Sequence, residues 1–132
     1  MRKLKGLEDV IGVSIVDPIL SDKGWAFSEQ PGAIPDSVNH TQYLQDIYVK
    51  ADPKYTGRIT VPVLWDKEKQ TIVNNESREI IRMLDVEFTE FATLENNLYP
   101  KELQQQIDDT IDKIYMPINN GVYRSGFATT QE

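Results

Sequence analysis

A proline inside an apolar run constrains the fold of this chain more than any other feature. Residues 59–64 read Ile-Thr-Val-Pro-Val-Leu, a β-strand pattern, yet Pro62 has no N–H to donate to a neighbouring strand. The run must therefore lie at the edge of a sheet or break its ladder of hydrogen bonds. If the bond before Pro62 is cis, the N–H and C=O of Val61 face outward, and an extended peptide-like ligand can pair with them.

The residues after this run predict a second strand and a helix. Residues 67–70 are charged or polar, residues 71–73 are Thr-Ile-Val, and the apolar residues of 80–84 have helical spacing. Because the first N–H groups of a helix lack intrahelical partners, a helix that begins near Asn75 favours a bound carboxylate. Without a ligand, the same stretch describes a bulged hairpin followed by a helix that Asn75 or Ser77 caps.

The residues before the proline predict one strand, one loop and one helix. The continuous apolar run of 10–16 is typical of a buried strand in a parallel sheet. Glycines and prolines interrupt residues 21–38, which predict an irregular loop. Helical spacing over 40–50, after the capping candidate Asn39, predicts a helix.

The rest of the chain has a helical pattern only. Pro100 opens an amphipathic helix, and Pro117 is expected to kink its last turn. The apolar positions of this helix are Leu103, Ile107, Ile111, Ile114 and Ile118. Residues 129–132 have the Thr-x-x-Glu form of a capping box, so another helix is expected to begin there. The pattern changes from Asp85 onward, and a length of 132 residues suits one small domain or parts of two.

Charge and composition exclude several classes of function. The chain has 14 basic and 21 acidic residues and a net charge of −7, which argues against nucleic-acid binding. No stretch approaches membrane-spanning length and the first residues do not form a signal peptide, so we expect a cytoplasmic protein. The chain contains no cysteine and therefore has no thiol chemistry of its own.

Two groups of polar residues do not indicate a metal site. His40 is the single histidine and precedes a predicted helix, which is typical of a surface or capping residue. Asp108, Asp109 and Asp112 cluster on one helix without a further ligand, so a solvated helix face explains them better than a metal does.

Several stretches resemble the glutathione transferase superfamily. Residues 60–66, Thr-Val-Pro-Val-Leu-Trp-Asp, are similar to that family's strand with its cis-proline, and residues 74–77, Asn-Asn-Glu-Ser, are similar to its helix start. Four further stretches resemble one branch, the glutathionyl-hydroquinone reductases, also called xi-class glutathione transferases. They are residues 4–8, 24–27, 48–57 and 119–128.

The resemblance implies a fold. Residues 1–85 would be an incomplete α/β thioredoxin-like, glutathione-binding domain without its first strand and most of its first helix. Residues 86–132 would be the start of an all-α glutathione transferase C-terminal domain. The chain would then be a fragment of a longer enzyme, which the resemblance implies to be a homodimer.

The resemblance also implies a reaction, with glutathione as co-substrate and no metal. In the family, a cysteine of a Cys-Pro-Trp motif attacks the sulfur of a glutathionylated hydroquinone, and the resulting mixed disulfide is resolved by a second glutathione. That cysteine is expected upstream of Met1. No catalytic residue is therefore expected in this chain, which alone is expected to be inactive.

The resemblance assigns glutathione-binding roles to five residues. The backbone of Val61 and Pro62 would pair with the cysteinyl part of glutathione, and Glu76 and Ser77 would hold the γ-glutamyl ammonium and carboxylate. Trp25 would cover the tripeptide, although the residue pattern equally describes an aromatic that packs its own loop onto the sheet.

Two further positions carry open alternatives. Gln45 stands where some family members have a basic residue, so the resemblance implies no charged contact from its helix. Tyr123 matches the tyrosine that lines the family's hydroquinone pocket, whereas the residues alone suggest a core tyrosine at the end of the long helix.

Two other functions stay open. The chain could be a non-catalytic module that binds glutathione or a peptide, or an interaction domain whose acidic helix over 101–119 packs against a partner protein.

Overall fold

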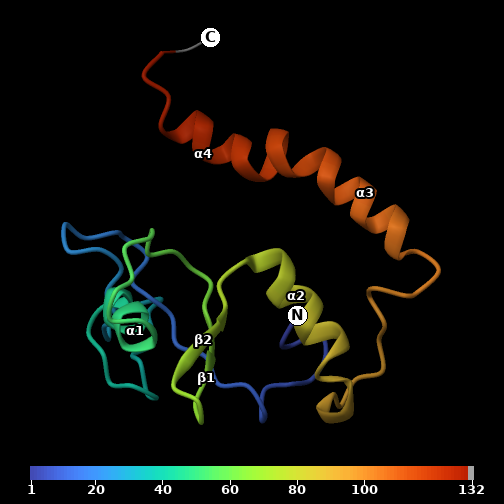
Figure 1. Cartoon of the computed structure of the whole chain (residues 1–132), viewed down its shortest axis with the longest axis horizontal. Coiled ribbons are helices and arrows are strands. Elements are labelled where there is room, and N and C mark those ends of the chain that lie inside the picture. Colours follow the sequence, from blue (N-terminus) through green and yellow to red (C-terminus); the bar gives the residue numbers. More distant parts are fainter. Residues whose placement is uncertain (131–132) are drawn as a thin grey trace. The chain divides into compact units, whose positions relative to one another are not determined.

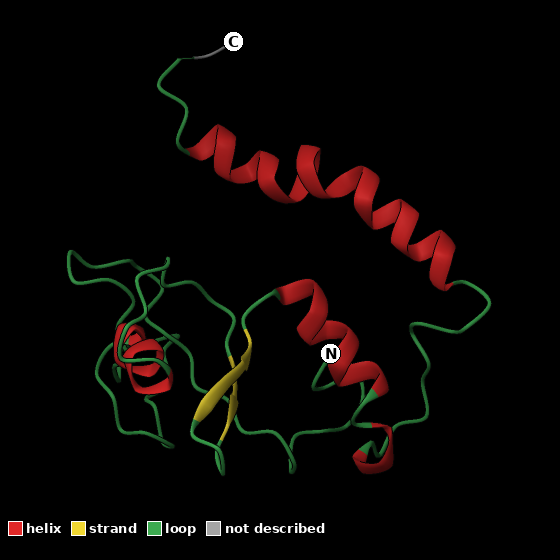
Figure 2. Ribbon diagram, in the orientation of Figure 1, coloured by secondary structure: helices red, strands yellow, loops and turns green. Residues whose placement is uncertain are grey.

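The computed structural model describes residues 1–130 and divides into two compact units, Met1–Glu95 and the part from Asn96 onward. Figure 1 labels the helices and strands, and Figure 2 colours them by type. The capping box predicted at 129–132 falls partly on Gln131 and Glu132, which lie outside the described residues.

A two-stranded antiparallel hairpin stands at the centre of the first unit. Strand β1, Leu64–Asp66, pairs with β2, Thr71–Asn74, with an irregularity in the register after Leu64. A carboxylate oxygen of Asp66 accepts hydrogen bonds from the N–H groups of Glu68 and Lys69 in the turn, at 2.9 and 2.8 Å. The predicted hairpin is confirmed, and the peptide bond between Val61 and Pro62 is cis.

Helix α2, Ser77–Val86, follows directly from β2 and confirms the helix predicted after the hairpin (Figure 1). The predicted cap is wrong, because the N-cap is Glu76 and no side chain caps the helix. Its buried positions Ile80 and Leu84 pack with Leu7 in one of two hydrophobic clusters. Two of the predicted apolar positions are therefore buried, whereas the third, Ile81, is 49% exposed.

Helix α1, Leu44–Ala51, starts later than predicted, and Asn39 does not cap it. Its N-cap is Tyr43, whose N–H donates to the Asp46 carboxylate at 3.1 Å. The helix cannot extend back to residue 40, because His40 has a φ of 56°. Residues before Tyr43 instead wrap around a buried carboxylate, that of Asp36.

The strand predicted over residues 10–16 is wrong. Within residues 1–130, the pairing of this run is limited to an isolated antiparallel bridge between Ile15 and Ile34, with two N–H···O bonds of 2.9 Å. Val10, Val13 and Ile15 are 42 to 48% exposed. An apolar run forms a strand of a parallel sheet only where a neighbouring strand exchanges backbone hydrogen bonds with it along its length. Among the described residues, this run has no such neighbouring strand.

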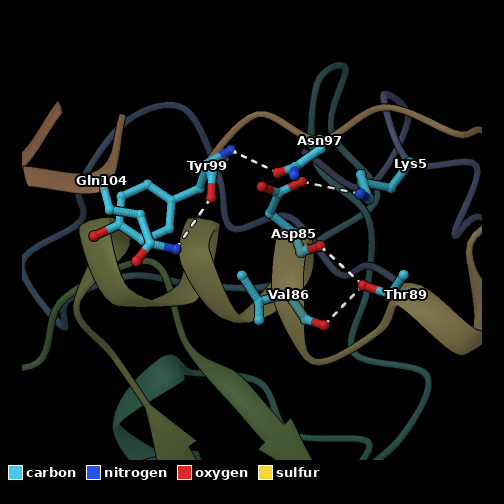
Figure 3. A network of polar contacts seen from close by, with 7 residues as sticks. All are labelled: Lys5, Asp85, Val86, Thr89, Asn97, Tyr99 and Gln104. Atoms are coloured by element: carbon cyan, nitrogen blue, oxygen red, sulfur yellow. Dashed lines mark hydrogen bonds and ion pairs between the residues drawn. The ribbon is translucent and has the colours of Figure 1, made fainter. Parts of the chain in front are cut away.

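A buried ion pair ties the N-terminal segment to the end of α2. Lys5 Nζ lies 2.9 Å from Asp85 Oδ1, and both side chains are almost inaccessible (Figure 3). The Thr89 hydroxyl donates to the carbonyls of Val86, at 2.8 Å, and Asp85, at 3.3 Å, where a short 3-10 helix, Thr89–Phe91, begins. The C-terminal end of α2 is therefore held by both charge and hydrogen bonds.

The second unit is a helix with a widened turn. Helix α3, Gln104–Ile114, is followed by a π-helical turn, Tyr115–Asn119, and by α4, Asn120–Gly126. Proline lacks an N–H and its ring crowds the carbonyl four residues earlier, so the irregularity predicted at Pro117 is present as the π turn. It is not the last turn of the helix, as predicted, because α4 continues to Gly126.

The start predicted for this helix, at Pro100, is wrong by four residues. The N–H of Leu103 donates to the carbonyl of Pro100 at 2.9 Å and forms a turn before α3. The Gln104 side chain donates to the Tyr99 carbonyl at 3.2 Å, and the Tyr99 N–H donates to Asn97 Oδ1, also at 3.2 Å (Figure 3). These side-chain bonds hold the residues around Pro100 in a turn rather than a helix. Across residues 1–130, no helix combines the length and apolar character that crossing a bilayer requires.

Candidate functional site

The open end of the hairpin brings together the two segments that the sequence singled out. Residues 60–63 lead into β1, and residues 74–77 lead from β2 into α2. Leu64 pairs with Asn74, so the two segments leave the hairpin next to each other. Asn75 Nδ2 donates to Thr60 Oγ1 at 3.4 Å, which is a direct contact between them. Val61 directly follows Thr60, and Glu76 directly follows Asn75. The contact between Thr60 and Asn75 therefore brings Val61 and Glu76 near each other.

The first segment offers an unused backbone edge. Val61 is 47% exposed. Within residues 1–130, its N–H and C=O take part in no backbone hydrogen bond. An extended ligand can satisfy both groups by pairing along this edge, in the manner of an added strand.

The second segment offers donors at a helix N-terminus. Glu76 is the N-cap of α2 and has no side-chain cap bond, while its N–H donates to Asn74 Oδ1 at 2.7 Å. Ser77 is the first helical residue, and its side chain is exposed. The N–H and hydroxyl of Ser77 stand at the positive end of the helix dipole, where a carboxylate is stabilised.

A cavity of about 610 Å³ runs along one side of the first segment. Residues 10–16 line one wall and residues 61–65 line another, with Leu44 and Ile47 from α1. Val61 and Pro62 therefore face both the open edge and this mainly apolar cavity. Trp25, Glu76 and Ser77 do not line the cavity.

Trp25 and Gln45 occupy positions around α1. Trp25 is half-buried, packs against the cluster of Leu44, Ile47 and Tyr48, and its carbonyl accepts the Leu44 N–H at 2.8 Å. The loop of Trp25 is therefore packed onto α1. Gln45 is exposed. Among residues 1–130, no hydrogen bond joins Trp25 or Gln45 to residues 60–63 or 74–77.

Tyr123 belongs to the second unit, on α4. Its side chain is 66% exposed, so the expectation of a core tyrosine is wrong for this chain. The neighbouring side chains of Val122 and Phe127 are 69 and 84% exposed. This end of α4 presents a largely uncovered apolar surface.

Asp108 and Asp109 each accept a hydrogen bond from a side chain of the second unit. The Tyr99 hydroxyl donates to Asp108 at 2.7 Å, and the Gln105 side chain donates to Asp109 at 2.8 Å. In the part of the chain that the structure describes, no group of three or more His, Asp or Glu side chains is placed to hold a metal ion.

Sequence reasoning missed Tyr48, which is buried below the candidate site. Its hydroxyl donates to the Thr60 carbonyl at 2.8 Å and accepts from Asn75 Nδ2 at 3.1 Å. In the sequence, Tyr48 belongs to the predicted helix over 40–50 and begins the stretch 48–57 that resembles the reductases. No local pattern signals that its hydroxyl reaches two segments that are 12 and 27 residues away.

Asp36 makes the stability of the first unit depend on pH. Burial alone raises the pKa of its carboxyl, but donors from Asn39, Thr41 and Val38 outweigh burial and bring this pKa below its ordinary value of 3.8. Because the folded chain holds the carboxylate more strongly than the unfolded chain, its stabilisation is complete above pH 3.8 and is lost as the pH falls through the lower, folded pKa.

We therefore expect the free energy of unfolding to fall less between pH 7 and about pH 3 in Asp36→Asn than in the parent chain. Urea unfolding at both pH values measures this difference. Asp22→Asn is the matched control, because Asp22 is exposed in the same unit. An equal loss in the parent and in Asp36→Asn would contradict this role.

The chain is similar to known proteins over its whole length. Residues 1–87 match the family described as glutathione S-transferase, N-terminal domain. The glutathionyl-hydroquinone reductase PcpF of Sphingobium chlorophenolicum is 50% identical over 132 residues, which cover 100% of this chain and 42% of PcpF.

Two solved structures share the fold over 98% of the chain. The xi class GST from Natrialba magadii is 57% identical with a TM-score of 0.94, and 40% of its chain is covered. The glutathione-bound structure of YqjG, a glutathione transferase homologue from Escherichia coli K-12, is 50% identical with a TM-score of 0.91, and 43% of its chain is covered. The chain thus spans about two-fifths of the length of these relatives.

These similarities confirm the predicted fold class. The first unit is a partial thioredoxin-like glutathione transferase N-terminal domain with a two-stranded sheet, and the second unit is the start of the helical C-terminal domain.

Proposed function

The chain belongs to the glutathione S-transferase family, and from this membership we propose that it supplies the glutathione-binding domain of a glutathionyl-hydroquinone reductase. One observation carries the proposal. The unused backbone edge at Val61 and the start of α2 lie next to each other through the contact between Thr60 and Asn75. An elongated tripeptide with a carboxylate at one end matches a site of this kind.

Glutathione would bind across both segments. Its cysteinyl N–H and C=O pair with the backbone of Val61 beside Pro62, as an added strand would. Its γ-glutamyl carboxylate accepts from the N–H and hydroxyl of Ser77, and its ammonium pairs with the Glu76 carboxylate. Trp25 covers the tripeptide from the loop before α1.

The reaction needs a thiolate that this chain does not contain. A cysteine upstream of Met1 attacks the sulfur of the glutathionylated hydroquinone. A disulfide to glutathione forms, the bond between sulfur and the aromatic carbon breaks, and that carbon takes up a proton. The thiolate of a second glutathione then attacks the mixed disulfide, which releases glutathione disulfide and restores the cysteine.

Several properties of the whole protein complete this proposal. Tyr123 would line the pocket for the glutathionylated aromatic substrate. The full-length protein would be a cytoplasmic homodimer without affinity for nucleic acid, membranes or metal. The boundary between its glutathione-binding and helical domains would lie between residues 85 and 86.

The sequence also left open a second function, that of a module without catalysis. The chain would then bind glutathione, or serve as an interaction module, without chemistry of its own. Binding without turnover by the longer protein would favour this alternative over a reductase.

We expect the 132-residue chain to bind reduced glutathione with a dissociation constant of about 1 mM or below, which corresponds to about 4 kcal/mol. It should release no hydroquinone from a glutathionyl-hydroquinone. Isothermal titration calorimetry measures the binding, and chromatography of the aromatic product measures the turnover. Absence of heat or of saturation with the folded chain would overturn the glutathione site, and hydroquinone release would overturn the external cysteine.

A further inference from the structure

We propose that Tyr48 is a positioning residue that sets the spacing between the two halves of the glutathione site. The inference rests on the proposed function, because it assigns a role at that same site. Tyr48 itself lies below the site, so the proposal gives it no contact with the ligand.

The hydroxyl of Tyr48 joins the two segments. It donates to the Thr60 carbonyl at 2.8 Å and accepts from Asn75 Nδ2 at 3.1 Å, and the Thr60 N–H points to it at 3.4 Å. Thr60 directly precedes Val61, and Asn75 directly precedes Glu76. One oxygen atom therefore holds the residue before each half of the site.

The ring of Tyr48 is a rigid support for that oxygen. The side chain is 2% exposed and packs with Leu44 and Ile47 in the core of the first unit. The ring of Tyr55 lies against it, with ring centroids 4.8 Å apart. A hydroxyl on a buried, tightly packed ring cannot follow a shift of either segment, so both segments are held at a fixed separation.

A fixed separation matters to a ligand that spans both halves. Without it, binding must also order the two segments relative to each other, and that cost is subtracted from the affinity. A ligand that contacts only one half does not carry this cost. The separation that the tripeptide must span is thus set by a core residue.

The test compares Tyr48→Phe with Tyr55→Phe. Both substitutions remove one hydroxyl that donates to a backbone carbonyl at 2.8 Å, but the Tyr55 hydroxyl bonds Arg58 within its own loop. We expect Tyr48→Phe to raise the dissociation constant of glutathione about three- to tenfold, and Tyr55→Phe to change it less than about twofold. Calorimetry is performed well below the melting temperature, where circular dichroism confirms that each variant is folded.

A half-ligand separates positioning from a general loss of stability. L-Glutamate can occupy only the Glu76 and Ser77 half, so its affinity, measured by NMR titration, should be the same in the parent and in Tyr48→Phe. A purely structural role would weaken both ligands alike, and an unchanged glutathione affinity would also overturn the proposal. If Tyr48→Phe does not fold, Asn75→Ala removes the same link from its exposed end and should reproduce the glutathione effect.

The ligand-free chain distinguishes this proposal from the proposed function. If the parent chain does not bind glutathione, the proposed function fails. Amide chemical shifts still report the link, because Tyr48→Phe should move the signals of both Val61 and Ser77, whereas Tyr55→Phe should leave Ser77 unchanged. A Tyr48→Phe spectrum in which only one segment moves would show that the hydroxyl does not couple the two.

Discussion

Replacing Asp85 with alanine is expected to lower the free energy of unfolding of the first unit by about 3–5 kcal/mol. Its carboxylate lies 2.9 Å from Lys5 Nζ, and the two side chains are only 2% and 4% exposed. Without this carboxylate, the ammonium of Lys5 remains buried but loses the ion pair with Asp85, which removes a large part of what offsets its desolvation cost. Since small domains have about 5–15 kcal/mol of stability in total, much of the first unit's stability would be lost.

The consequence reaches the candidate site through α2. The ion pair holds the C-terminal end of this helix, and the helix N-terminus carries Ser77. Urea unfolding followed by circular dichroism measures the loss. The control is the double variant Lys5→Met with Asp85→Leu, which removes both charges and is expected to lie within about 1–2 kcal/mol of the parent. A single Asp85→Ala variant as stable as the double variant would contradict a net dependence on the pair.

Replacing Ser77 with alanine is expected to weaken glutathione binding by about 10- to 100-fold. A hydrogen bond to a charged group contributes about 1.5–3 kcal/mol, and the hydroxyl of Ser77 would donate to the γ-glutamyl carboxylate. The stability should change little, because the side chain is exposed and α2 has no side-chain N-cap bond. Titration calorimetry with reduced glutathione, together with a melting curve, measures both effects.

Ser125→Ala is the matched control for this prediction. Ser125 is an exposed helical serine on α4, so its substitution removes a hydroxyl of the same kind. It should leave the dissociation constant for glutathione unchanged. An affinity loss of equal size in both variants would show that the Ser77 effect is not specific, and an unchanged affinity in Ser77→Ala would remove this residue from the proposed site.

The elements that the sequence predicted well are those whose cause is local. The hairpin was predicted from two short apolar runs around a charged and polar turn, and α2 from apolar spacing within ten residues. The interruption at Pro117 follows from the missing N–H of a single residue. Each of these features depends on residues that are close in the sequence, so it can be predicted from the sequence alone.

The errors concern elements whose form depends on distant groups. Residues 10–16 are as apolar as a buried strand, but a strand also needs a partner along its length, and the described pairing reaches only Ile15. The start of α1 moved to Leu44 because the carboxylate of Asp36 and the φ of His40 organise the preceding residues as a loop. The spacing of apolar residues reveals neither the hydrogen bonds of Asp36 nor the backbone conformation of His40.

For the candidate site, the sequence alone determined its chemical groups: a proline that frees the backbone beside Val61, a Glu-Ser helix start, and the absence of cysteine. Only the tertiary structure decided how these groups lie together. The contact between Thr60 and Asn75 spans 15 residues, and the bond from Asn75 to Tyr48 spans 27. Contacts at such separations arise from packing of the whole unit around its core, because no short stretch of chain brings these atoms within hydrogen-bond distance.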